Sequence, residues 1–150
     1  KEGMKAARAM ALLSYRNAYA YNKTQPLNEN DDFRKLKAIT YQQYQGEKLA
    51  RRFNAYSYYT LTKAFDSHHV GRNRGGLKKA LSAITANTLI IAIDTDLLFP
   101  KEDQELSAGL IPGACLKFIH SDYGHDGFLL EYNSLTKEIR AFMKNVKTFK

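Results

Sequence analysis

The chain has 150 residues, of which 44% are hydrophobic and 25% charged, and a formal net charge of +8. This length is enough for one domain with its own core, and no apolar run approaches the ~20 residues of a membrane-spanning helix, so we expect no membrane association. The basic residues are scattered, which favours solvated surface over nucleic-acid binding, although a basic surface would also attract an anionic cosubstrate. The single cysteine, Cys115, excludes an internal disulfide and fits a reducing, cytoplasmic setting.

Residues 1–66 have a helical pattern, rich in Tyr, Gln, Asn and Arg, and contain no strand pattern. Apolar and small side chains recur at helical spacing in the first segment, at Met4, Ala7, Ala11, Tyr15 and Ala18. Residues 24–32, with Pro26 and several Asn and Asp residues, are predicted to form a loop, and residues 41–53 and 56–65 two more helices. We expect a partly solvated helical layer over a cleft. Because the chain opens within the first helical pattern and without an initiator Met, we expect it to be truncated.

The rest of the chain alternates between helix and strand patterns. The predicted elements are a helix over 77–84, a strand over 88–93, a helix over 101–110, a strand over 115–119 and a final helix. The final helix has Leu135, Ile139, Phe142 and Val146 on one face, with Ser134 as its expected N-cap. This alternation predicts an α/β fold with a parallel sheet. Because two strands are too few for a stable sheet, we expect further strands from a partner chain or from the rest of a longer polypeptide.

Asp96 and His125 are the main candidates for catalysis. Asp96 follows the strand over 88–93, and His125 lies in a glycine-flanked turn after the strand over 115–119. Functional groups of open α/β sheets gather outside the carboxyl ends of the strands, and Asp followed by His is the second half of the Ser…Asp…His order of α/β-hydrolases. The carboxylate would fix the imidazole tautomer and stabilise its protonated form. Taken singly, Asp96 could be a helix cap or turn residue and His125 a turn histidine; their order and positions together favour catalysis.

Other residues carry weaker signals. Asp94 is the rival carboxylate, and we prefer Asp96 because it lies farther into the loop. Asp126 is either a solvated or capping carboxylate or a partner for a substrate ammonium group. Cys115 lies in a strand pattern, which favours an inert buried thiol over a nucleophile. No serine lies in a Gly-x-Ser-x-Gly motif, so we expect the nucleophile to lie outside this chain.

Two patterns suggest a metal or phosphate site only faintly. His68 and His69 are adjacent and cannot share a face, and no Cys or acidic cluster has metal-ligand spacing, so we expect no metal site. The run from Gly71 to Gly76 loosely resembles a phosphate-binding loop, but it lacks the Lys-[Ser/Thr] pair of a P-loop and follows no strand. We interpret it as a flexible basic connector, with contact to an anionic ligand as the alternative.

Several linked motifs, in order, resemble the C-terminal part of the homoserine O-acetyltransferase family. They are residues 3–16, 44–46, 52–58, 61–66 and 69–75, followed by Asp96-Leu-Leu-Phe-Pro100 and Tyr123-Gly-His-Asp-Gly-Phe-Leu129. The resemblance implies the C-terminal portion of an α/β-hydrolase fold, with a helical lid over 1–75 and a part of the core over 76–150. It also implies a homodimer through the lid helices.

The resemblance further implies roles for three residues. Asp96 and His125 would be the acid and base of a Ser-His-Asp triad whose Ser lies upstream of Lys1, and Asp126 would help to hold the substrate amino group. The implied reaction belongs to methionine biosynthesis. It moves an acetyl group from the cosubstrate acetyl-CoA to the hydroxyl of L-homoserine by double displacement, without a bound cofactor.

Mild departures leave the specificity open. Asn54 stands where the family usually has Asp, and residues 67–69 differ from its common polar run. Relatives use serine as acceptor or succinyl-CoA as donor. The alternatives are an esterase or thioesterase of the same fold, with water as acceptor, and a catalytically inert fragment or basic module. By itself, the chain is expected to be inactive because it lacks the nucleophile.

Overall fold

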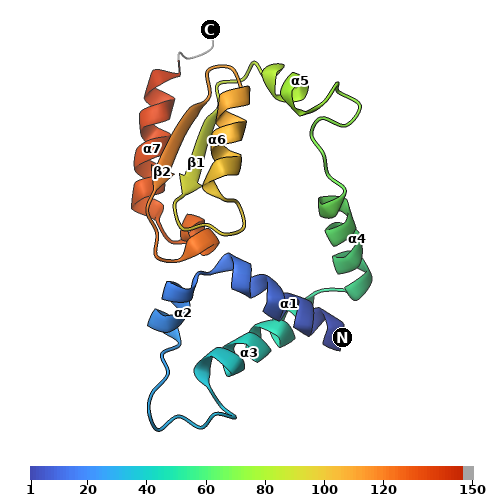
Figure 1. The fold of residues 1–150 in the computed structure, drawn as a ribbon, viewed down its shortest axis with the longest axis vertical. Helices are drawn as coiled ribbons and strands as arrows, with labels where there is room; N and C mark the ends of the chain where they lie inside the picture. Colours follow the sequence, from blue (N-terminus) through green and yellow to red (C-terminus); the bar gives the residue numbers. More distant parts are fainter. Residues whose placement is uncertain (147–150) are drawn as a thin grey trace. The chain divides into compact units, whose positions relative to one another are not determined.

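The computed structural model describes residues 1–146. The chain divides into two compact units, one from Lys1 to His68 and one that begins at His69 (Figure 1). The first unit is helical and the second combines helices with a parallel sheet. Within residues 1–146, no helix is long and apolar enough to cross a membrane.

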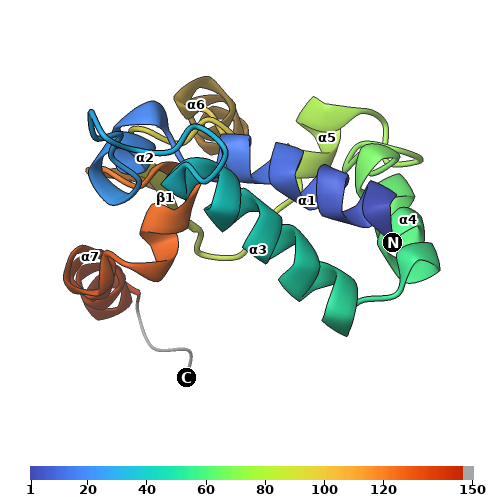
Figure 2. The same cartoon turned by 90° about the horizontal axis from the view of Figure 1, so that it is seen from below.

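The first unit consists of four helices: α1 (Glu2–Tyr15), α2 (Ala18–Thr24), α3 (Lys37–Arg52) and α4 (Ala55–Asp66). Helix α1 packs along α3, and Figure 2 shows the two side by side. Their approach is close at Gly46, where a Cβ atom would lie 3.0 Å from the carbonyl oxygen of Lys5. The buried apolar residues of this unit are Met4, Leu12, Ala20 and Leu49.

The helical spacing noted from Met4 to Ala18 does not correspond to one continuous helix, since α1 ends at Tyr15 and α2 begins at Ala18. The chain leaves the helix at Arg16, whose backbone is extended (φ −125°, ψ 150°). A new helix then starts after Asn17, whose side-chain oxygen accepts a hydrogen bond from the N–H of Ala20 at 2.8 Å. Asn is among the best N-cap residues, and here its capping bond outweighs a continuous apolar spacing. The predicted loop and the two later helices are confirmed, with α3 beginning four residues earlier than expected, at Lys37 rather than Tyr41.

The second unit contains α5 (Leu77–Ser82), β1 (Leu89–Ile93), α6 (Lys101–Leu110), β2 (Cys115–Ile119), the 3-10 helix η1 (Gly124–Leu129) and α7 (Tyr132–Asn145). Strands β1 and β2 pair in parallel, with Leu89 opposite Cys115 and Ile93 opposite Ile119. Helices α6 and α7 each contact both strands, and Figure 1 shows the sheet between them. The predicted α/β alternation and parallel sheet are confirmed.

The core of this unit is small. Its buried apolar residues are Leu81, Ala92, Ile93, Ile111 and Ile119. The predicted cap of the last helix is wrong: α7 begins at Tyr132 after Glu131 and has no side-chain capping bond, so Ser134 lies inside its first turn. The sheet has two strands among residues 1–146, fewer than an independently stable sheet usually needs.

Candidate active site

The site residues lie where β1 and β2 end. The ladder continues one step beyond the strands, since the N–H of Asp94 donates to the carbonyl of Ile119 at 3.1 Å. Because the strands are parallel and in register, the segments that follow β1 and β2 leave the sheet at the same end, beyond the carboxyl ends of both strands. The loop after β1 carries Asp94 and Asp96, and the loop and η1 after β2 carry His120 and His125.

Asp96 and His125 meet at this end of the sheet. Nδ1 of His125 lies 2.8 Å from Oδ2 of Asp96, and their side chains are 19% and 7% exposed. An ionised carboxylate can only accept, so Nδ1 carries the proton of this bond. The other oxygen, Oδ1, accepts the N–H groups of Leu98 at 2.8 Å and Phe99 at 3.0 Å. Asp96 is therefore a turn residue and a histidine partner at the same time.

The imidazole of His125 lies between two aromatic rings. The ring centroids of Phe99 and Phe128 are each 5.1 Å from that of His125, and both rings are inclined to it. A cavity of about 140 Å³ adjoins the pair and is lined by Ile91, Ala92, Ile93, Asp96, Phe99, Gln104, His125 and Phe128. The Asp–His pair thus adjoins a mainly apolar cavity, where its hydrogen bond is shielded from water and is stronger than at the open surface.

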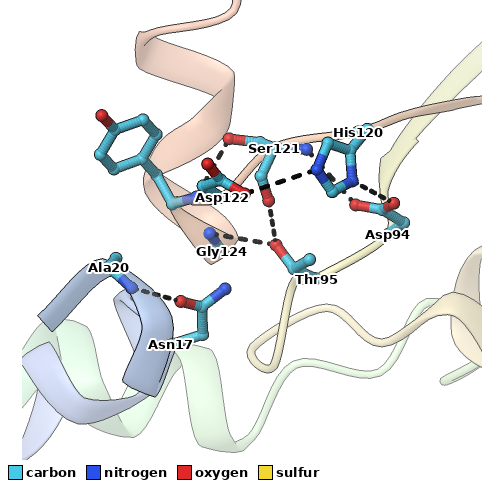
Figure 3. Close-up of polar contacts among 9 residues, drawn as sticks. Asn17, Ala20, Asp94, Thr95, His120, Ser121, Asp122 and Gly124 are labelled. Atoms are coloured by element: carbon cyan, nitrogen blue, oxygen red, sulfur yellow. Dashed lines mark hydrogen bonds and ion pairs between the residues drawn. The ribbon is translucent and has the colours of Figure 1, made fainter. Parts of the chain in front are cut away.

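Asp94 binds a different histidine, His120, which belongs to none of the motifs in the sequence. Nδ1 of His120 lies 2.7 Å from Oδ2 of Asp94, and its Nε2 lies 3.5 Å from Oδ1 of Asp122 (Figure 3). The hydrogen bond to Asp94, and secondarily its negative charge, raise the pKa of His120 above the ordinary 6.5. The signal in the sequence was position: Asp94 and His120 each directly follow a strand, and the last residues of these strands are paired.

The other residues singled out in the sequence take no part in the Asp96–His125 bond. Asp126 is half-buried in η1, directly after His125. Cys115 begins β2 as a free, half-buried thiol. His69 accepts the N–H of Gly71 on Nδ1, at 3.1 Å, and the run from Gly71 to Gly76 forms hydrogen-bonded turns. In the part of the chain that the structure describes, no group of three or more His, Cys, Asp or Glu side chains could hold a metal ion.

Parallel strands between helices, with an Asp–His pair at the strand ends, define part of an α/β-hydrolase fold. The solved homoserine O-acetyltransferase of Bacillus anthracis matches this fold with a TM-score of 0.85 at 22% identity, over 99% of this chain and 42% of that structure. That of Staphylococcus aureus has a TM-score of 0.76 at 28% identity, over 99% of this chain and 43% of that structure.

Sequence similarity identifies the relatives of this chain more narrowly than the fold does. No family model matches the chain. The curated homoserine O-acetyltransferase of Cyclobacterium marinum is 44% identical over 144 residues, which are 95% of this chain and 40% of the relative. The chain is therefore a homologue of homoserine O-acetyltransferases over nearly all of its own length, and it spans about two fifths of theirs. The resemblance predicted from the sequence is confirmed, and the share covered is consistent with a C-terminal part.

Proposed function

We propose that this chain is the part of a homoserine O-acetyltransferase that supplies the acid and base of a Ser-His-Asp triad. The observation that carries the proposal is the partly buried Asp96–His125 hydrogen bond at the carboxyl ends of two parallel strands, in a chain 44% identical to a homoserine O-acetyltransferase. The reaction would move the acetyl group of acetyl-CoA to the hydroxyl of L-homoserine, a step of methionine biosynthesis.

The geometry supports a two-step mechanism. Since Nδ1 of His125 donates to Asp96, Nε2 is the nitrogen that acts as base. His125 would remove the hydroxyl proton of a serine supplied by a part of the protein outside this chain. The serine oxygen bonds to the thioester carbon, the C–S bond breaks, and the CoA sulfur takes the proton from His125. His125 then removes the proton of the homoserine hydroxyl, whose oxygen attacks the acetyl-serine ester. The serine oxygen leaves and takes the proton back.

Other parts of the chain would serve binding. Asp126 directly follows the catalytic histidine, and its carboxylate would hold the ammonium group of homoserine. Residues 1–75 would be the lid of the enzyme and the dimer contact. The support for this is an unusual exposure of apolar side chains: Tyr56 and Phe65 of α4 are 84% and 79% exposed, and α4 has no buried residue. Acetyl-CoA enters as a cosubstrate, which the basic chain would attract, and we propose a cytoplasmic enzyme.

The decisive experiment uses the full-length protein that contains this chain. Acetyl-CoA and L-homoserine are supplied, and free CoA thiol and O-acetyl-L-homoserine are measured together. Equal amounts of both are the expected result. L-Serine and succinyl-CoA, tested as replacements, define the acceptor and the donor. Release of free acetate at the same rate with and without homoserine would overturn the transferase proposal in favour of an esterase or thioesterase.

The chain by itself should behave differently from the full-length protein. We expect no release of CoA thiol by residues 1–150 alone because the nucleophile is missing. We also expect a weak or absent cooperative unfolding transition because the sheet has only two strands in the described part of the chain. Thiol release by the isolated chain would contradict the assignment of an external serine.

A further inference from the structure

One hydroxyl group joins the two loops that carry Asp96 and His125. Oγ1 of Thr95 donates to the carbonyl oxygen of Ser121 at 2.5 Å and accepts the N–H of Gly124 at 3.2 Å (Figure 3). Thr95 lies just beyond β1, and Ser121 and Gly124 lie beyond β2. These bonds connect residues 26 and 29 positions apart in the sequence. They therefore fix a non-local arrangement and not the shape of a single turn.

The position of this bridge in the sequence is informative. Thr95 directly precedes Asp96, and Gly124 directly precedes His125. If Thr95 and Gly124 moved apart, Asp96 and His125 would move with them, and the Asp96–His125 bond of 2.8 Å would lengthen. The Thr95 hydroxyl therefore holds the carboxylate and the imidazole in register through their backbones.

The surroundings make this bridge hard to replace. Ser121 is 1% exposed and Gly124 is buried, so water cannot readily take over a lost bond. Loss of the Thr95 hydroxyl would leave a buried carbonyl and a buried N–H without this partner, which carries the full desolvation penalty. Ser121 itself is fixed on other sides: its N–H donates to Oδ1 of Asp94 at 3.3 Å, and its Oγ accepts the N–H of Tyr123 at 3.2 Å.

We propose that Thr95, through Ser121 and Gly124, is a positioning residue for the Asp96–His125 pair. The inference rests on the proposed function, because it assigns the bridge a part in the transferase reaction. Thr95 does not touch the reacting atoms in this role; it keeps the base oriented while the proton moves on and off Nε2.

The test compares three variants of the full-length enzyme. Thr95→Val removes the hydroxyl at constant shape, and Thr95→Ser keeps it. Thr88→Val is the matched control, because Thr88 flanks the other end of β1 and its hydroxyl donates locally to the carbonyl of Ala86 at 3.0 Å. We expect Thr95→Val to lower kcat about 10-fold to 100-fold with little change in KM, since a small misplacement of catalytic groups has effects on this order.

The pattern among the variants separates positioning from simple destabilisation. Thr95→Ser should restore most of kcat, and Thr88→Val should have the wild-type kcat and pH–rate profile. Wild-type kcat in Thr95→Val, or an equal loss in Thr95→Ser, would overturn the inference. If Thr95→Val does not fold, Thr95→Cys replaces it, since a thiol is a much weaker donor and acceptor than a hydroxyl. The kcat of Thr95→Cys should be lower than that of Thr95→Ser and of the wild type, but above zero. A kcat equal to that of Thr95→Ser would count against the bridge.

A second measurement does not depend on activity. The proton between Nδ1 of His125 and Asp96 should give a downfield NMR resonance, which its loss in Asp96→Asn would assign. We expect this proton to exchange with water faster in Thr95→Val and at the wild-type rate in Thr88→Val. If the wild-type enzyme makes no O-acetyl-L-homoserine, the proposed function fails. The exchange rates still decide whether Thr95 positions the pair.

Discussion

The two Asp–His pairs at the end of the sheet follow the same plan in different surroundings. In each, Oδ2 of the aspartate meets Nδ1 of the histidine, at 2.7 Å for Asp94–His120 and 2.8 Å for Asp96–His125, while Oδ1 accepts a backbone N–H. The side chains of the first pair are 42% and 71% exposed, and those of the second 7% and 19%. Bond length therefore does not distinguish the two pairs. Their burial, and the rings of Phe99 and Phe128 around His125, do distinguish them.

Replacing the two histidines should separate the pairs most strongly. In the full-length enzyme, His125→Ala should lower kcat at least ~10³-fold, in line with removal of a triad base. His120→Ala is the matched control and should leave kcat nearly unchanged, because His120 is exposed and bound to a different carboxylate. Steady-state kinetics with acetyl-CoA and L-homoserine measures both. A large loss in His120→Ala together with a small one in His125→Ala would reverse the assignment.

Replacing the two aspartates should also separate the pairs, with a somewhat smaller loss of kcat. Asp96→Asn retains an oxygen for the N–H groups of Leu98 and Phe99, so the turn is kept. Its amide NH₂ would face Nδ1 of His125, which forces the proton to Nε2 and removes the base. We expect kcat to fall by up to about 10⁴-fold, less than in His125→Ala, because loss of the triad carboxylate costs less than loss of the base.

Asp94→Asn is the control for the aspartates and should have a nearly wild-type kcat, because Asn keeps an oxygen that can accept the N–H of Ser121. A wild-type kcat in Asp96→Asn as well, with the variant folded as judged by circular dichroism, would argue that the buried bond is structural only. Equal losses in the two variants would mean that both pairs support the site.

The sequence predicted the strands and the Asp96–His125 pair for one physical reason. Apolar β-branched runs form buried strands, and parallel strands bring the residues that follow them to a common edge. Nothing local indicated the partner of Asp94 or the bridge from Thr95, because these depend on the register between β1 and β2. The boundaries of two helices also differ from the sequence pattern, because local spacing and capping preference do not decide alone where a helix begins or ends. At Asn17 a capping bond ended an apolar repeat, and at Ser134 a good capping residue lies within a helix whose start is set elsewhere.

Tight packing under the turn that carries His125 predicts an effect on stability. A Cβ atom at Gly127 would lie 2.6 Å from Oγ of Ser121 and 3.1 Å from Cδ1 of Ile93. Gly127→Ala should therefore destabilise the full-length protein by about 1–3 kcal/mol, as overpacking does. Gly109→Ala in α6 is the control: no atom lies within 4 Å of its Cβ, and helix propensity favours Ala by up to about 1 kcal/mol. Urea unfolding measures both, and a neutral Gly127→Ala would refute this packing argument.

The smallest effect concerns the exposed pair and its pH dependence. The hydrogen bond to Asp94 raises the pKa of His120 above 6.5, so protonated His120 is favoured in the folded protein. Its contribution to stability is full below pH 6.5 and is lost as the pH rises through the raised pKa. An NMR titration of the His120 ring should give this raised pKa and a lower one in Asp94→Asn. Asp122→Asn should lower the pKa less, since Asp122 lies 3.5 Å from the His120 ring and Asp94 lies 2.7 Å from it.

The two Asp–His pairs should also differ in their response to added salt. Exposed charges are screened by ions and buried ones much less, so added salt should lower the pKa of His120 toward 6.5 and leave the bond between His125 and Asp96 intact. The downfield Nδ1 proton of His125 reports the second result in the same spectra. If salt weakened that resonance as readily as it lowered the pKa of His120, the two pairs would share one environment, and burial could not be what separates the proposed catalytic pair from its neighbour.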